Sequence, residues 1–202
     1  MIRFCVVLLL MCLASLPVRA ETQTLLALGD SLTAGLGLDP TQAFPAKLEA
    51  ALKARGHDVV VLNAGVSGDT AAQGAARLDW ALTDDVDAVL VELGANDALR
   101  GLAPEQAKQA LDGLLATLQQ RKLPVLLLGM KAPPNLGPDY GAAFDAMFPE
   151  LAKQYGVALY PFFLDGVAAD AKLNQADGMH PNPQGVDEIV KRVLPSVEAL
   201  LK

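Results

Sequence analysis

Thiol and imidazole groups are scarce in this chain of 202 residues, which contains two cysteines and two histidines. Both cysteines, Cys5 and Cys12, lie within the first 20 residues, so the rest of the chain has no thiol for a disulfide or a nucleophile. The two histidines, His57 and His180, are too few for a zinc site built from several imidazoles. We therefore expect no metal site and a fold that is stabilised by an apolar core.

Basic residues are also fewer than acidic residues. Lys and Arg total 16 against 23 Asp and Glu, which gives a formal net charge of −7. A nucleic-acid partner would require a basic surface, so we expect none. The length suits one domain, and no internal repeat, charge run or Ser/Gly-rich linker marks a second one.

The first 20 residues resemble a secretory signal peptide. Arg3 precedes an apolar run at 4–14, and Val-Arg-Ala at 18–20 resembles a small-residue cleavage site. The run is shorter than the roughly 20 residues of a membrane span. We predict a cleaved signal peptide at 1–20, a domain at 21–202, no stable membrane span, and a periplasmic or secreted protein. A retained anchor or a lipid on Cys12 are the alternatives, although Met11 is large for the position before a lipidated cysteine.

Short β-prone runs alternate with longer helical patterns along the whole domain. Strands are predicted at 24–28, 59–62, 88–93, 125–128 and 157–160, and helices at 44–55, at 70–82, from Pro104 onward, at 140–155 and at 183–201. This alternation implies right-handed crossovers and a parallel sheet that is covered on both faces. The predicted fold is a three-layer α/β/α domain with a central, mainly parallel five-stranded sheet.

Polar, glycine-containing segments follow the first three predicted strands and precede the last helix. They are Gly-Asp-Ser at 29–31, Asn-Ala-Gly-Val-Ser-Gly-Asp-Thr at 63–70, Gly-Ala-Asn-Asp at 94–97 and Asp-Gly-Met-His-Pro-Asn at 177–182. Each segment alone has an ordinary interpretation, as a helix cap or a turn. Because functional groups gather at the carboxyl ends of parallel strands, the four segments are expected to meet at one edge of the sheet.

Together these segments supply the groups that a hydrolytic serine requires. Such a serine needs a base within hydrogen-bonding reach, an acid that orients the base, and donors for the developing oxyanion. Asp177 and His180 are three residues apart, close enough for the carboxylate to hold the imidazole beside Ser31. The backbone N–H groups of Ser31 and Gly68 and the side-chain amide of Asn96 are candidate oxyanion donors.

The four segments, in this order, resemble those of the SGNH hydrolases, the superfamily of GDSL-motif lipases and esterases. Residues 89–101 and Tyr-Pro-Phe-Phe at 160–163 resemble a bacterial subgroup of exported acyl-CoA thioesterases, lysophospholipases and arylesterases. The one small departure is Gly-Ala-Asn-Asp at 94–97, where Gly-Gly-Asn-Asp is common. The resemblance implies a flavodoxin-like fold, Ser31 as nucleophile, His180 as base with Asp177 as its partner, and no metal or organic cofactor. It implies an oxyanion hole formed by Ser31, Gly68 and Asn96.

The resemblance also implies the substrate class. We expect a serine esterase or thioesterase that hydrolyses acyl-CoA thioesters, aryl esters or lysophospholipids through an acyl-enzyme, with a small molecule as its partner and a monomeric state. The loop at 131–140 is expected to border the acyl chain, and the substrate contacts are expected from Asp30, Asn135, Leu136 and Met179. The alternatives are a carbohydrate acetylesterase of the same fold and a non-enzymatic exported ligand-binding protein.

Three other polar residues need separate interpretations. Glu92 interrupts an apolar strand, either as a buried acid that orders the neighbouring loops or as an edge residue that faces solvent. His57 lies between a helix and a strand, so we expect it on the surface at the opposite end of the sheet from Ser31. Ser67 lacks the final glycine of Gly-x-Ser-x-Gly and is a poor candidate for a nucleophile.

Overall fold

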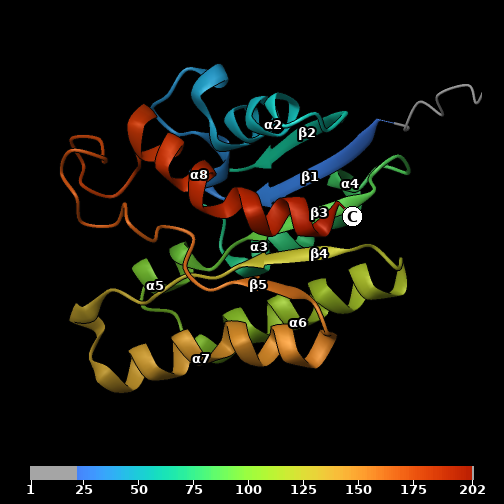
Figure 1. Cartoon of the computed structure of the whole chain (residues 1–202). Helices are drawn as coiled ribbons and strands as arrows, with labels where there is room; N and C mark the ends of the chain where they lie inside the picture. The colour runs from blue at the N-terminus through green and yellow to red at the C-terminus, as the bar shows by residue number, and fades with distance from the viewer. Residues whose placement is uncertain (1–21, 202) are drawn as a thin grey trace, which may run out of the picture.

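The computed structural model describes residues 22–201 and contains one five-stranded sheet (Figure 1). All neighbouring strands are parallel, in the order β2-β1-β3-β4-β5. The strands are β1 (Gln23–Gly29), β2 (Val59–Gly65), β3 (Ala88–Glu92), β4 (Val125–Leu128) and β5 (Ala158–Tyr160). The predicted five-stranded parallel sheet is confirmed, whereas the predicted signal peptide at 1–20 lies outside the described residues.

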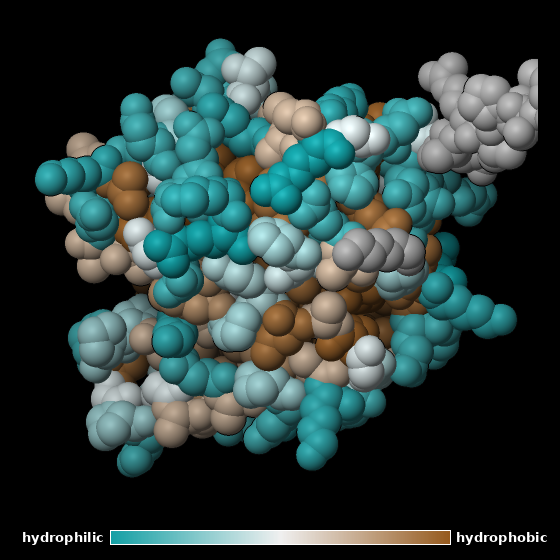
Figure 2. Space-filling view, in the orientation of Figure 1, coloured by the Kyte–Doolittle hydropathy of each residue, from teal (hydrophilic) through white to brown (hydrophobic). Residues whose placement is uncertain are grey.

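Helices cover both faces of the sheet and complete the three layers (Figure 1). One layer pairs α2 (Phe44–Ala54) with α8 (Pro183–Leu200), and the other contains α3 (Ala71–Ala76), α6 (Pro104–Gln120) and α7 (Pro138–Tyr155). The apolar stripe predicted for α6 is buried against the sheet, since Ala107, Leu111, Leu114, Leu115 and Leu118 have almost no exposed surface. Figure 2 shows hydrophilic side chains over much of the surface in this view, with hydrophobic patches between them.

The predicted helix at 70–82 is divided into two. It ends at Ala76 and restarts as α4 (Leu78–Ala81), because Arg77 leaves helical geometry with φ −106° and ψ 6°. Four short elements have no counterpart in the predicted pattern, because three to five residues are too few to show a helical period. They are α1 (Ser31–Ala34), η1 (Pro40–Gln42), α5 (Ala95–Leu99) and η2 (Pro134–Leu136).

The strand order reverses at β1, which lies between β2 and β3. The crevice at such a reversal is where open α/β sheets bind ligands. In the strand registers Gly29, the last residue of β1, is aligned with Gly65 of β2 and with Glu92 of β3. A Cβ atom on Gly65 would lie 2.2 Å from the backbone nitrogen of Ala34, so glycine is required for α1 to cross the end of β2. The loops after the first three strands therefore begin side by side.

Within residues 22–201, none of the helices combines the length and the apolar character that a membrane crossing requires.

Candidate active site

The serine, imidazole and carboxylate predicted from the sequence form one hydrogen-bonded line. Ser31 is the first residue of α1, directly after β1, and its Oγ lies 2.9 Å from Nε2 of His180. Nδ1 of His180 lies 2.6 Å from Oδ2 of Asp177. The fold therefore brings together two segments that are 149 residues apart in the chain.

Asp177 is held in its anionic form by three donors. Its Oδ1 accepts hydrogen bonds from the backbone N–H groups of Met179 (2.9 Å) and His180 (3.0 Å). These two bonds and the imidazole on Oδ2 lower the pKa of Asp177 to about 2. A carboxylate can only accept, so Nδ1 of His180 carries the proton that faces it, and Nε2 presents its lone pair to the Ser31 hydroxyl.

The two backbone N–H groups of the candidate oxyanion hole are free to bind an anion. Among the described residues, neither the N–H of Ser31 nor that of Gly68 has a hydrogen-bond acceptor. Gly68 has φ +89°, a conformation that favours glycine, and Arg100 donates a 2.6 Å hydrogen bond to its carbonyl oxygen. The loop after β2 is therefore tied to the end of α5.

Asn96, the third candidate donor, already uses both hydrogens of its amide. Its Nδ2 donates to Oδ2 of Asp30 and to the carbonyl oxygen of Asp69, both at 3.0 Å. These bonds fix the nitrogen end of the amide toward the loops after β1 and β2. An oxyanion can receive a hydrogen bond from Asn96 only if one of these hydrogens is shared or redirected.

Sequence reasoning missed Arg77, which cross-links the ends of β1 and β2 and the loop that follows β2. Its guanidinium donates to the carbonyl oxygens of Gly29 (2.8 Å) and Ala64 (2.7 Å) and to the carboxylate of Asp69 (2.6 Å). The side chain is 17% exposed, so these bonds are largely protected from water. No local signal identified it, because a single arginine in an alanine-rich helical pattern is typical of a solvent-exposed position.

A cavity of about 480 Å³ opens beside Ser31, a size typical of small-molecule sites. Its lining is mainly apolar and includes Leu32, Leu99, Met130, Pro133, Leu164, Ala168, Ala169 and Met179. Polar groups on the lining come from Asp30, Ser31, Asn96, Lys131 and His180. The sequence did not single out Leu99 or Leu164, because nothing local to these two residues indicates that they face the cavity, whereas Lys131 begins the loop at 131–140 that was expected to border the acyl chain.

The four residues expected to contact substrate have different positions. Met179 is half exposed and lines the cavity. Asp30 borders the cavity but is 0% exposed, with its carboxylate bonded to Leu32 and Asn96. Asn135 and Leu136 are not among the lining residues: they lie in η2, where Leu136 packs against the core. The loop reaches the cavity through Lys131 and Pro133 instead.

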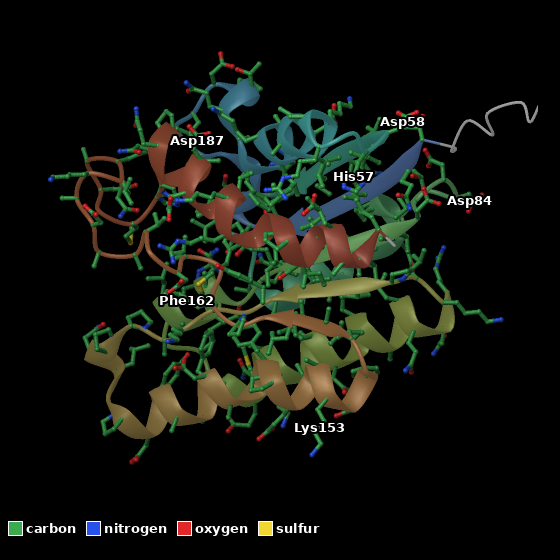
Figure 3. The ribbon with its side chains drawn as sticks, in the orientation of Figure 1. His57, Asp58, Asp84, Lys153, Phe162 and Asp187 are labelled. Carbon is green, nitrogen blue, oxygen red and sulfur yellow. The ribbon has the colours of Figure 1, made fainter. Side chains whose placement is uncertain are left out.

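His57 lies away from this site, as the sequence predicted. It precedes β2 at the amino edge of the sheet, with Nε2 3.3 Å from Oε1 of Glu198. Figure 3 places His57 and Asp58 toward the end of the sheet at which the strands begin, and Phe162 at the opposite end. The Nζ atom of Lys131 lies 5.3 Å from the centroid of the Phe162 ring. Among residues 22–201, no group of three or more His, Cys, Asp or Glu side chains is arranged to hold a metal ion.

A Ser-His-Asp line at the carboxyl edge of a parallel α/β sheet, beside an apolar cavity, is the arrangement of a serine hydrolase. Residues 27–187 match the model of the GDSL-like Lipase/Acylhydrolase family. The chain belongs to this family and is a hydrolase of acyl esters or thioesters.

Curated relatives and solved structures agree with this assignment. The chain is 44% identical to Esterase TesA of Pseudomonas aeruginosa over 91% of this chain and 92% of that protein. It is 40% identical to thioesterase 1/protease 1/lysophospholipase L1 of Escherichia coli, over 88% and 86% of the two chains. A crystal structure of TesA superimposes with a TM-score of 0.84 at 43% identity, covering 88% of this chain and 99% of that one. The esterase EstA of Pseudoalteromonas, described as inhibited by monoethylphosphonate, gives a TM-score of 0.83 at 32% identity, covering 89% and 98%.

Proposed function

We propose that this enzyme hydrolyses its substrates through an acyl-enzyme on Ser31, with His180 as the base and Asp177 as its partner. The observation that carries the proposal is the hydrogen-bonded line from Ser31 Oγ through both imidazole nitrogens to the Asp177 carboxylate. In this line the lone pair of Nε2 already faces the hydroxyl proton. The reaction therefore requires no prior rearrangement of the three side chains.

The reaction has two halves. Ser31 Oγ attacks the acyl carbonyl carbon while Nε2 of His180 takes the hydroxyl proton, and the tetrahedral intermediate collapses when the imidazolium returns this proton to the leaving alcohol or thiol. Water then attacks the acyl-enzyme with the same imidazole as base, which releases the carboxylic acid and restores Ser31. Throughout, the Asp177 carboxylate stabilises the imidazolium.

The oxyanion hole consists of the N–H groups of Ser31 and Gly68 together with the Asn96 amide. The first two donors have no acceptor among the described residues, and this supports their role. Asn96 contributes by sharing one hydrogen that the resting enzyme gives to Asp69 or Asp30. Removal of one such donor typically costs about 100- to 1,000-fold in turnover.

Labelling with a fluorophosphonate tests the nucleophile. A phosphonyl group is expected on the peptide that contains Ser31 and on no other peptide, since within residues 22–201 only this serine has a hydrogen-bonded imidazole. The phosphonate inhibition of the related EstA supports this expectation. Ser67→Ala is the matched control and is expected to be labelled at the wild-type rate. Labelling of wild type at another serine, or none at all, would contradict the proposal.

The substrates are acyl-CoA thioesters, aryl esters or lysophospholipids with an acyl chain of several carbons. The apolar lining of the cavity supports this class over acetylated carbohydrates, which would require a more polar groove. The names of the relatives, which include a thioesterase/lysophospholipase and an arylesterase, support the same range.

A chain-length series of p-nitrophenyl esters tests this substrate class. Each buried methylene contributes about 0.8 kcal/mol, so partial burial of an octanoyl chain is expected to raise kcat/KM at least about tenfold over the acetyl ester. Leu164→Ala, in the cavity wall, is expected to reduce this preference. Trp80→Ala, on α4 outside the cavity, is the control and leaves the preference intact. A preference for acetyl esters would favour a carbohydrate acetylesterase instead.

Export is part of the same proposal. Residues 1–20 are a signal peptide that is removed after Ala20, and the enzyme acts as a monomer in the periplasm or outside the cell. The positive residue Arg3 and the apolar run that follows it support this assignment. The intact mass of the protein before labelling gives the position of its mature N-terminus.

A further inference from the structure

Two buried carboxyl groups, Asp30 and Glu92, lie together behind the candidate oxyanion hole. They come from the adjacent ends of β1 and β3, and they are 0% and 1% exposed. Oε2 of Glu92 accepts hydrogen bonds from the Thr33 hydroxyl (2.9 Å) and from the backbone N–H of Asp30 (3.3 Å). Oε1 of Glu92 is also buried, and it has no hydrogen-bond partner among the described residues. The hydrolytic steps above leave Glu92 without a role.

The donors around this pair indicate which carboxyl group is charged. Both oxygens of Asp30 accept, Oδ1 from the backbone N–H of Leu32 (3.0 Å) and Oδ2 from the Asn96 amide (3.0 Å), as a carboxylate requires. Glu92 receives donors only on Oε2, which leaves Oε1 as the oxygen that carries a proton. Two adjacent carboxyl groups without access to water do not both ionise.

The electrostatics agree with this assignment. Burial, and then the neighbouring Asp30 charge, raise the pKa of Glu92 well above its ordinary value. Burial also raises the pKa of Asp30 to about 6, against the opposing effect of its hydrogen bonds to Leu32, Glu92 and Asn96. At pH 7 Asp30 is therefore mainly ionised, while Glu92 remains neutral.

We infer that Glu92 is a positioning residue for the proposed oxyanion hole: its buried, neutral carboxyl group accepts from the backbone N–H of Asp30, and the Asp30 carboxylate in turn holds the nitrogen end of the Asn96 amide toward the oxyanion. The inference rests on the proposed role of Asn96. A carboxylate cannot donate, so Asp30 accepts only from the nitrogen of the amide and prevents the carbonyl end of Asn96 from turning into the hole.

Kinetics of Glu92 variants test this role. Glu92→Ala removes the acceptor of the Asp30 N–H and the Thr33 hydroxyl, and leaving such buried donors without a partner typically costs a factor of about 10 to 100. We expect this loss in kcat with KM within about twofold, because the oxyanion exists only in the transition state and the intermediate. Glu92→Gln keeps a neutral side chain with an acceptor oxygen in the same place and is expected to retain kcat within about threefold. Equal losses in both variants would overturn the inference.

A double-mutant cycle separates positioning from general destabilisation. In the Asn96→Ala background, Glu92→Ala is expected to lower kcat by less than about threefold, because its effect is transmitted through Asn96. A purely structural role would repeat the full loss in that background and would overturn the inference. If Glu92→Ala does not fold, Glu92→Met keeps most of the side-chain volume and takes its place in the cycle.

Infrared spectroscopy tests whether the Glu92 carboxyl group is protonated, and it requires no substrate. The difference spectrum between wild type and Glu92→Gln at pH 7 is expected to contain the carbonyl stretching band of a protonated carboxylic acid. Absence of this band would overturn the inference even if Ser31 is labelled as proposed. Conversely, turnover that survives Ser31→Ala would overturn the proposed function while the band remained, so the two failures are distinguishable.

Discussion

Ser31→Ala is expected to lower kcat at least about 10,000-fold while the protein still folds. Without the Oγ atom no acyl-enzyme can form, and the oxyanion donors and the substrate cavity provide only the residual acceleration over water that triad-deficient hydrolases retain. The substitution removes one oxygen atom at the start of α1 and leaves the helix cap, Asp30, in place. The measurement is turnover of a p-nitrophenyl ester, together with the midpoint of thermal unfolding.

Ser67→Ala is the matched control for this experiment, because Ser67 lies in the neighbouring loop after β2 and has no imidazole partner among the described residues. It is expected to keep wild-type turnover. If Ser31→Ala kept more than about 1% of wild-type turnover and an unchanged unfolding midpoint, Ser31 would not be the nucleophile.

Asp177→Asn is expected to lower kcat by about 1,000- to 10,000-fold, a larger loss than simple removal of the charge would cause. Oδ1 accepts from the backbone N–H groups of Met179 and His180, so the amide oxygen takes this position and the amide nitrogen faces Nδ1. The amide then donates to Nδ1, which leaves the imidazole proton on Nε2, where it points at Ser31 Oγ. In this tautomer His180 cannot accept the hydroxyl proton.

Asp177→Ala distinguishes the tautomer effect from the loss of charge. Alanine leaves the imidazole free to adopt either tautomer, so this variant is expected to retain more turnover than Asp177→Asn. The reverse order would contradict the tautomer argument.

The pKa of Asp177, lowered to about 2, keeps its carboxylate ionised above that pH, so any loss of activity between pH 4 and 7 comes from another group.

The fold was predictable because its helices and strands are long enough to show their periods. Ala107, Leu111 and Leu118 recur at helical spacing, and this spacing matches the buried face of α6. The regular alternation of strands and helices permits few topologies, and the parallel sheet is one of them. The break at Arg77 was not predictable, because tertiary hydrogen bonds of its side chain to the ends of β1 and β2 accompany it.

The candidate site was predictable in composition and less so in geometry. Ser31, Asp177 and His180 were identifiable because each lies in a distinctive short motif, and the fold places them in one hydrogen-bonded line. Asn135 and Leu136 were expected at the cavity, but the turn at η2 directs Lys131 and Pro133 to it instead. Loop conformation depends on distant packing, which no local pattern encodes.

The sequence by itself therefore determined the class of fold, the family resemblance and the identity of the residues that can carry out the hydrolysis, because each of these depends on local periodicity or on a short motif. Only the tertiary structure decided the state of Glu92, which the sequence left between a buried and a solvent-facing position. It also decided that both Asn96 hydrogens are engaged at rest and that Arg77 joins the ends of β1 and β2. These properties arise from contacts between segments far apart in the chain, and they exist only when the loops after β1, β2 and β3 meet at one edge of the sheet.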